Sequence, residues 1–197
     1  MSERATDAHL STRPLPEGVT ATPVWGEWKR EDGTPKHRYR LLWTHAERAG
    51  VMNVVIGMNP SGASAEVADQ TLLKTWGFCG RWSNGPLLMT NVVAFRATAP
   101  SGMEIDPVAE DENLHQIRRA VQIAHRTGSK ARVVAAWGTP TLPKALRAKF
   151  DARVLAVHTM LREMNVPLLC LGTTRDGSPT HPLLIAYDTP LKLWSPR

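Results

Sequence analysis

The sequence predicts an α/β domain, a three-layer α/β/α sandwich around a central, mostly parallel four-stranded sheet. Four short apolar runs rich in Val and Leu are typical of buried strands, and segments with helical apolar spacing separate them. Strands that alternate with helices build parallel sheets whose faces are covered. The length of 197 residues suits one domain with a sizeable core.

The expected elements follow in a regular order. Residues 24–28 and 39–43 are expected to pair across a turn at 31–34. The central strands are expected at 54–57, 87–95, 132–137 and 167–172. Helices are expected at 69–82, at 111–126 with Gly128 as its C-cap, and at 142–164 as one piece or as two joined near residue 150.

The N-terminal segment, residues 1–23, is polar, contains proline and lacks the apolar region of a signal peptide. We expect a disordered arm there and a single domain at 24–197. No apolar run approaches the roughly 20 residues that span a bilayer, which favours a cytoplasmic protein without membrane contact. The two cysteines, Cys79 and Cys170, are too few for a disulfide framework, and we expect both to be buried.

The chain is basic, with a net charge of +6 and a pI of about 9.7, which favours a polyanionic partner such as DNA. Basic residues gather at 28–30 and 36–40, and the second group contains Lys36, Arg38 and Arg40. One interpretation is a phosphate-binding patch, and the other is a solvated hairpin.

Every expected central strand is followed or ended by a polar or aromatic group. Asn59 comes after the first strand and before Pro60, Asn91 lies within the second, Trp137 ends the third, and His181 follows the fourth. Ligands of α/β sheets bind at the carboxyl ends of strands, so these residues are candidates for one site. Each residue also has an ordinary structural interpretation. Asn59 would lie in a turn that ends its strand, and Asn91 would bond to a neighbouring loop. Trp137 would pack in the core, and His181 would lie in a turn at the surface.

Other catalytic templates are absent from the sequence. It contains no dinucleotide-binding or P-loop glycine pattern and no nucleophile-elbow pattern. His115 and His125 lie ten residues apart on one expected helix, a spacing that does not suit a metal site, and we expect both to face solvent.

Four segments in order resemble motifs of the uracil-DNA glycosylase superfamily: 57–60, 85–97, 133–138 and 180–184. The first is closest to the version in single-strand-selective uracil glycosylases. The chain also resembles a bacterial domain family of unknown function, whose pattern includes Asn59-Pro60-Ser61, Asp69-x-Thr71, Arg96-Ala97-Thr98, Trp137-Gly138 and His181-Pro182. The resemblance to the uracil-DNA glycosylases implies their fold over roughly residues 54–184.

This resemblance implies a monofunctional DNA glycosylase that hydrolyses an N-glycosidic bond and leaves an abasic site, with no metal and no cofactor. Asn91 would read the edge of a flipped pyrimidine, His181 would stabilise the departing base anion, and Asn59 would position the attacking water. The same resemblance offers further residues with other roles. The base-binding candidates are Met58, Phe78 and Trp82, and core packing is the favoured reading of the two aromatics. The DNA-binding candidates are Ser61, Arg96, Leu183, Leu184, Lys36, Arg38 and Arg40. Asp69, Thr71 and Trp137 are additional candidates, and helix capping is the favoured role of Asp69.

The chain departs from the superfamily in two places. The first motif continues as Ser61-Gly62, and Pro182 is not followed by the usual Ser-Pro. These differences favour a base other than uracil, such as a modified pyrimidine of phage DNA, and hence a role in phage-DNA restriction. Two alternatives remain open: an enzyme that binds or hydrolyses nucleosides or nucleotides, and a non-catalytic nucleic-acid-binding protein. We expect a monomer.

Overall fold

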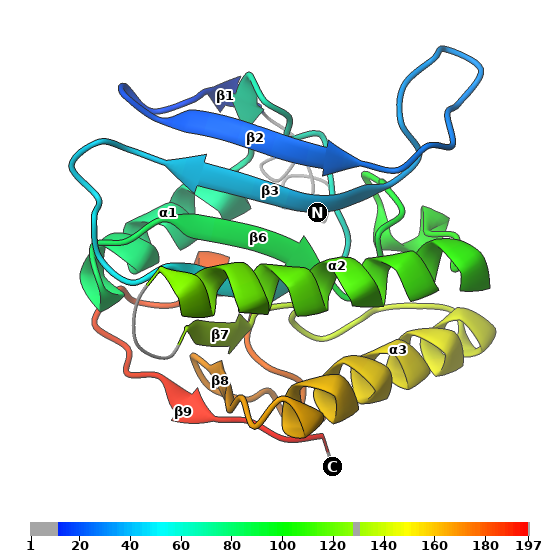
Figure 1. The fold of residues 1–197 in the computed structure, drawn as a ribbon. Coiled ribbons are helices and arrows are strands. Elements are labelled where there is room, and N and C mark those ends of the chain that lie inside the picture. Colours follow the sequence, from blue (N-terminus) through cyan, green and yellow to red (C-terminus); the bar gives the residue numbers. More distant parts are fainter. Residues whose placement is uncertain (1–11, 128–130, 197) are drawn as a thin grey trace, which may run out of the picture.

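The chain folds around a seven-stranded mixed sheet with helices on both faces (Figure 1). The computed structural model describes residues 12–127 and 131–196. The strands of this sheet are β2 (Thr20–Trp25), β3 (Arg38–Thr44), β4 (Asn53–Gly57), β6 (Leu87–Asn91), β7 (Arg132–Ala135), β8 (Leu168–Cys170) and β9 (Lys192–Leu193). Their order across the sheet is β2-β3-β6-β4-β7-β8-β9. β4 pairs in parallel with β6 and β7, and β7 with β8, whereas β2–β3, β3–β6 and β8–β9 are antiparallel.

The predicted α/β class is confirmed in coarse form, but the predicted four-stranded, mostly parallel sheet is wrong in strand number. The antiparallel pairing of β2 and β3 was expected but not counted in the four-stranded sheet, and the hairpin extends the sheet because β3 bonds to β6. The other edge gains β9, which has two residues and is too short to carry an alternating pattern.

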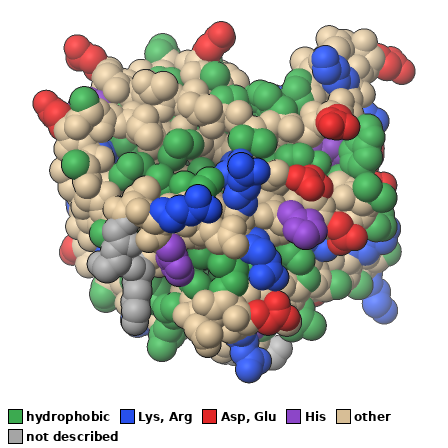
Figure 2. Space-filling view, in the orientation of Figure 1, with side chains coloured by type: hydrophobic (Ala, Val, Ile, Leu, Met, Phe, Trp, Pro, Cys, Tyr) green, Lys and Arg blue, Asp and Glu red, His purple; other side chains and the backbone are tan. Residues whose placement is uncertain are grey.

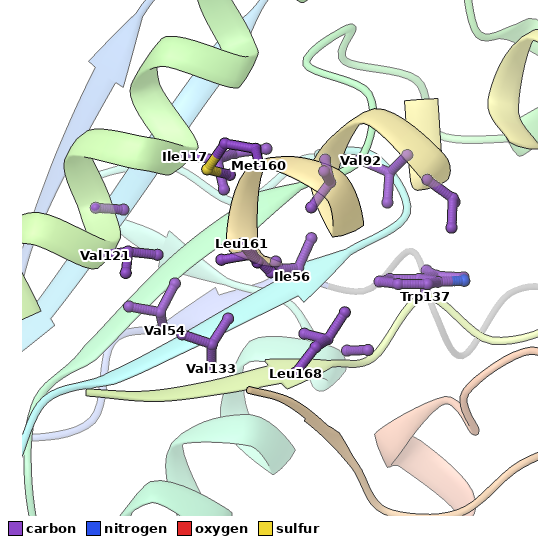
Figure 3. Close-up of a cluster of buried hydrophobic side chains, with 14 of the residues drawn as sticks. Val54, Ile56, Val92, Ile117, Val121, Val133, Trp137, Met160, Leu161 and Leu168 are labelled. Atoms are coloured by element: carbon purple, nitrogen blue, oxygen red, sulfur yellow. The ribbon is translucent and has the colours of Figure 1, made fainter. Parts of the chain in front are cut away.

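Apolar side chains fill both sides of the sheet. Helices α2 (Pro107–Arg126) and α3 (Lys144–Glu163) cover one side, and α1 (Gln70–Trp82) covers the other (Figure 1). The first core contains Val54, Ile56, Val133, Ile117, Val121, Met160 and Leu161 (Figure 3). The second contains Val55, Leu87, Val134, Leu72, Trp76 and Cys79. Because both faces are covered, every residue of β4 and β6 is buried, which explains their nearly continuous apolar sequence.

Two aspartates set the starts of helices. The side chain of Asp69 accepts a hydrogen bond from the Leu72 N–H and caps α1, as expected. α2 begins earlier than predicted because Asp106 accepts from the Ala109 N–H and Pro107 occupies the first helical position. α3 is one continuous helix through the buried Phe150. The expected C-cap Gly128 lies outside the described residues.

β6 ends at Asn91, short of the predicted residue 95, because α2 binds the segment that follows it. Glu110 Oε1 accepts from the Ala94 N–H at 2.9 Å, and Oε2 accepts from Asn113 Nδ2 at 3.0 Å. Asn113 Nδ2 also donates to the carbonyls of Asn91 (3.1 Å) and Val92 (3.2 Å). These bonds take backbone groups that a longer strand would pair with its neighbours.

The first described residues are paired. β1 (Arg13–Pro14) forms a two-stranded sheet with β5 (Val67–Ala68), and β2 begins at Thr20. The predicted disordered arm is therefore wrong for residues 13–14 and 20–23, and residues 1–11 lie outside the described residues. Both cysteines are free and buried, as expected. None of the helices in the described part of the chain is long and apolar enough to cross a membrane.

Glu110 makes the stability of the fold depend on pH. Its side chain is 1% exposed, and burial raises its carboxyl pKa from 4.5 to about 7. Between these values the native chain holds a proton that the unfolded chain releases, so the free energy of unfolding falls as the pH rises. We expect Glu110→Gln to remove up to about 3 kcal/mol of that fall between pH 4.5 and 7.5.

Urea unfolding of wild type and variant across this pH range measures the effect. Glu112→Gln is the matched control, because Glu112 is an exposed glutamate on the same helix. Equal pH slopes for wild type and Glu110→Gln would contradict the prediction.

Candidate functional site

The candidate residues lie at one edge of the sheet, where β4, β6 and β7 end. These strands pair in parallel, so their carboxyl ends share this edge. The loop after β4 carries Asn59, and β6 ends in Asn91. A third candidate, His181, comes from a distant segment of the chain and lies against Gly138, just past the end of β7.

Asn91 is a buried amide at the end of β6. It is 2% exposed and pairs in register with Gly57 of β4. A Cβ on Gly57 would lie 2.7 Å from Asn91 Oδ1, so the close approach requires a glycine there. Asn91 Nδ2 has no hydrogen-bond partner among the described residues. A buried amide donor without a protein partner is uncommon and is a candidate for binding a ligand or a water.

Asn59 joins two loops. Its Nδ2 donates to the carbonyls of Ala97 (2.8 Å) and Pro60 (3.1 Å). The backbone reinforces this junction, because the Val93 N–H donates to the Met58 carbonyl and the Ala97 N–H to the Pro60 carbonyl, both at 3.0 Å. The side chain of Asn59 is thus held in place by the segment that follows β6.

His181 begins a short 3₁₀ helix, η3 (Pro182–Leu184). Its Nδ1 accepts from the Leu183 N–H at 3.4 Å, which places the imidazole proton of the neutral ring on Nε2. Gly138, just past β7, has a φ of +72°, and a Cβ on it would lie 3.0 Å from the His181 Cβ. A glycine at this position therefore lets His181 approach the end of β7.

Asn91 and His181 lie on the side of the sheet that α1 covers. Asn91 is in phase with Leu87 and Met89, which pack in the core beneath α1. η3 contacts α1 directly. Met58, by contrast, packs against the core on the α2 and α3 side, so the structure does not bring it together with Asn91.

Two of the aromatic candidates, Phe78 and Trp137, are buried in the molecule, whereas Trp82 is half-buried and lines a surface pocket. Phe78 is fully buried, and its ring lies 5.3 Å from Trp82 and 4.9 Å from Tyr187 between ring centroids. Trp137 is 2% exposed and contacts Trp194 at 5.0 Å in the core that Figure 3 shows. Core packing was the favoured interpretation for Phe78 and the ordinary one for Trp137. Both side chains are found in such a packed environment.

The basic residues at 36–40 do not form one surface patch. The β2–β3 register shifts between Val24, which pairs with Arg40, and Trp25, which pairs with Arg38. This irregularity turns Arg38 toward the α1 side, where its Nη1 donates to the Ala63 carbonyl at 2.6 Å. Arg38 is 3% exposed, so the predicted surface contact with phosphate is wrong for this residue.

Lys36 and Arg40 are half-buried. Arg40 lies close enough to α2 to interact electrostatically with Glu112 and Arg119. Figure 2 shows that basic and acidic side chains are interspersed on the face that carries α2 and α3. Among the described residues, this face offers no continuous positive stripe for a polyanion.

Arg38 belongs to a buried polar cluster at the start of α1. Ser61 Oγ donates to Asp69 Oδ2, and Asp69 Oδ1 accepts from the Leu72 N–H at 2.8 Å. Burial lowers the pKa of Arg38 to about 10, and the charge of Asp69 opposes this shift. The cap role expected for Asp69 is confirmed. Thr71 is half-buried in the first turn, where its carbonyl accepts from Thr75 Oγ1 at 2.6 Å.

Sequence reasoning missed Glu110 and Asn113, which hold the segment after β6. A signal was present: two polar residues three positions apart on the apolar face of a helix that follows Asp106-Pro107. The sequence placed Arg30 in a basic segment with a possible phosphate-binding role, but it did not indicate the long-range contact of this side chain. It is bonded to the carbonyl of Arg96, a residue 66 positions away in the chain.

The two aspartate caps provide a matched comparison. We expect Asp106→Ala to lower the free energy of unfolding by about 1 kcal/mol, the usual value for a cap. Asp69→Ala should cost about 2–4 kcal/mol, because it also removes the acceptor of Ser61 and the negative charge facing the buried Arg38. Urea unfolding at pH 7 measures both, and equal losses would contradict the assigned role of Asp69.

The comparisons with known proteins identify one family. No curated protein matches the chain. The family described as "Protein of unknown function (DUF1643)" matches residues 38–183, which include β3, all three α-helices and the sheet edge with Asn59, Asn91 and His181. This chain therefore belongs to the DUF1643 family.

Proposed function

We propose that the protein is a DNA glycosylase that hydrolyses the N-glycosidic bond of a flipped-out pyrimidine, with a modified base favoured over uracil. The observation that carries the proposal is the Asn91 amide, buried at a strand end with an Nδ2 that no described residue satisfies. The resemblance of the four segments to uracil-DNA glycosylases supports the same assignment.

The spacing of Asn91 and His181 suits a base between them. β6 and β7 flank β4, so their ends lie two strand spacings apart, about 10 Å. A six-membered ring hydrogen-bonded on opposite edges fits such a gap, with donor–acceptor distances near 2.9 Å. Gly57 and Gly138 carry no side chain at the two strand ends, and their place is taken by Met89 and Asn91 over Gly57 and by His181 over Gly138.

In this proposal, Asn91 reads the base and His181 stabilises the leaving group. An amide offers a donor and an acceptor, which matches the edge of a pyrimidine. When the bond between C1′ and the base nitrogen breaks, its electron pair leaves with the base. Negative charge then develops on a base carbonyl oxygen, and His181, protonated at Nε2, can donate a hydrogen bond to it.

Asn59 would orient the attacking water. Its Nδ2 is engaged by two carbonyls, so Oδ1 is the atom that would accept a hydrogen from the water. The water oxygen forms the new bond to C1′, one water proton goes to the departing base, and an abasic site remains. An amide is a weak base, so Asn59 contributes position and not proton transfer.

A second candidate function is non-catalytic binding of nucleic acid. One observation favours it: Asn59 already has a structural task, because it joins the loop after β4 to the segment after β6. A protein of this kind would bind DNA with no base release from any substrate.

Base release tests the proposal. Purified protein is incubated with single- and double-stranded oligonucleotides that carry uracil, a thymine mismatch, or modified cytosines and thymines, and alkali reveals abasic sites. We expect Asn91→Asp and His181→Ala to lower the rate by about 100-fold or more, because each removes a donor from the base.

The controls are Asn165→Asp and His125→Ala, which change an exposed asparagine and an exposed histidine away from the edge. DNA binding without base release would support the second candidate. Base release that survives in both site variants would contradict the assigned residues, and release of plain uracil alone would remove the preference for a modified base.

Leu184 provides a test of strand separation. It is 94% exposed, and it lies within η3 three residues after His181. An apolar side chain there can enter the stack from which a base has left. We expect Leu184→Ala to lower base release from duplex DNA by about tenfold and to leave single-stranded substrates unchanged, because unstacking costs a few kcal/mol only in the duplex. Leu193→Ala, at a 76% exposed leucine of β9, is the control, and an equal loss on both substrates would contradict a wedge role.

A further inference from the structure

A cleft of about 540 Å³ lies between the β2–β3 connection and the segments that follow β4 and β6. Its polar lining comprises Arg30, Asp32, Thr34, Ser61, Arg96 and Thr98. In Figure 1 the β2–β3 connection projects from the upper right of the molecule. The cleft adjoins the candidate site, because Ala97 lines it and accepts a hydrogen bond from Asn59.

The two arginines of the cleft are held in place by backbone groups. Nη1 of Arg30 and Nη1 of Arg96 both donate to the Pro35 carbonyl, at 3.2 and 3.1 Å. Nη2 of Arg30 also donates to the Arg96 carbonyl. Their carbonyl partners carry no charge, so these bonds fix the guanidinium groups without neutralising them.

Aromatic rings support both guanidinium groups. Arg30 lies 5.6 Å from the centroid of the Phe95 ring, and Arg96 lies 5.0 Å from that of Trp25. Contacts of this kind orient a guanidinium and stabilise it modestly. The guanidinium groups of Arg30 and Arg96 are therefore preorganised before a ligand binds.

The charge of this pair is only partly balanced by the one acidic side chain that lines the cleft. In residues 12–127 and 131–196, neither guanidinium has a carboxylate within 4.0 Å. Asp32 is the acidic group of the lining, and its charge attracts both arginines, while its Oδ1 accepts from both the N–H (2.9 Å) and the hydroxyl (2.6 Å) of Thr34. Arg96 Nε is buried without a hydrogen-bond partner among the same residues. Two adjacent cations with an unsatisfied donor favour the binding of an anion.

We propose that this cleft binds one phosphate group of a polynucleotide, next to the nucleotide whose base enters the sheet edge. Guanidinium groups bind phosphate oxygens through paired hydrogen bonds, and the hydroxyl of Thr98 can donate to a remaining oxygen. The inference rests on the proposed function for the polymer, since the base site and the cleft share the loops that Asn59 joins. It assigns phosphate contact to Arg30 and Arg96 and not to Lys36 or Arg40.

Binding of an unmodified single-stranded oligonucleotide tests the proposal without any base release. We expect Arg30→Gln and Arg96→Gln each to weaken binding about tenfold at every base sequence. Each should also lower the slope of log K against log salt concentration by at most about 0.7, the value for the one phosphate contact to a single strand that the two arginines share. Arg126→Gln, at the exposed end of α2, makes the same charge change elsewhere and should leave affinity and slope unaltered.

A second variant guards against loss of structure, because both arginines bond to backbone carbonyls. Thr98 is exposed and lines the cleft, so Thr98→Asp leaves the arginines in place and adds a repelling charge. It should weaken oligonucleotide binding about tenfold, whereas Thr159→Asp on the exposed side of α3 should not. Unchanged affinity and slope in Arg30→Gln, Arg96→Gln and Thr98→Asp would overturn the proposal.

The source of the phosphate is resolved by competition. Inorganic phosphate and a deoxynucleoside 5′-monophosphate are each titrated against the labelled oligonucleotide. Weak competition by both supports a polynucleotide, and monophosphate binding as tight as the oligonucleotide overturns the polymer assignment. If no base is released while the variants weaken binding as expected, the result contradicts the proposed glycosylase chemistry and leaves the phosphate site in place.

Discussion

The arrangement of the candidate site depends on how α2 holds the backbone after β6. Glu110 and Asn113 together bind Ala94 and the carbonyls of Asn91 and Val92, and they end the strand there. The freed segment then reaches Ala97, whose carbonyl accepts from Asn59. The loop after Asn59 carries Ser61, which donates to the capping residue of α1. One buried carboxylate and one buried amide on α2 thereby fix the geometry of loops from two strands and the start of a helix on the opposite face.

The two parts of the proposed binding surface use different physical means. At the sheet edge, the buried amide of Asn91 and the half-buried imidazole of His181 would recognise a base through its shape and its hydrogen-bonding groups. In the cleft, guanidinium groups fixed by carbonyls attract a phosphate of any nucleotide. Asn59 lies between them and bonds to the rim of the cleft. A base reader and a phosphate holder joined by one short loop can therefore act on the same nucleotide.

The sequence predicted the central elements well, because their signals are local. The strand before Asn59, the helix after Asp69 and the hairpin around residues 31–34 follow from apolar runs, a cap and a turn. The end of β6 was predicted too late, since the bonds that stop the strand come from Glu110 and Asn113, which act at a distance of about 20 residues. The pairing of Arg30 with Arg96 spans 66 positions, and no local pattern encodes it. Arg38 was expected at the surface because a regular basic hairpin would expose it, and only the irregular register buries it.

That register shift sets a rule for insertions and deletions. Tyr39 is the extra residue between the pairs Val24–Arg40 and Trp25–Arg38, so the side chains before and after it follow different phases. Deleting Tyr39 would restore the regular alternation of side chains along β3. Arg38 would then point away from Ala63, and another residue would occupy its buried position. The exposed turn at residues 31–34 carries no such constraint, since a longer connection there changes no strand phase. Homologues of this chain should therefore vary in length at the tip of the hairpin while keeping a fixed number of residues between Arg38 and Leu41.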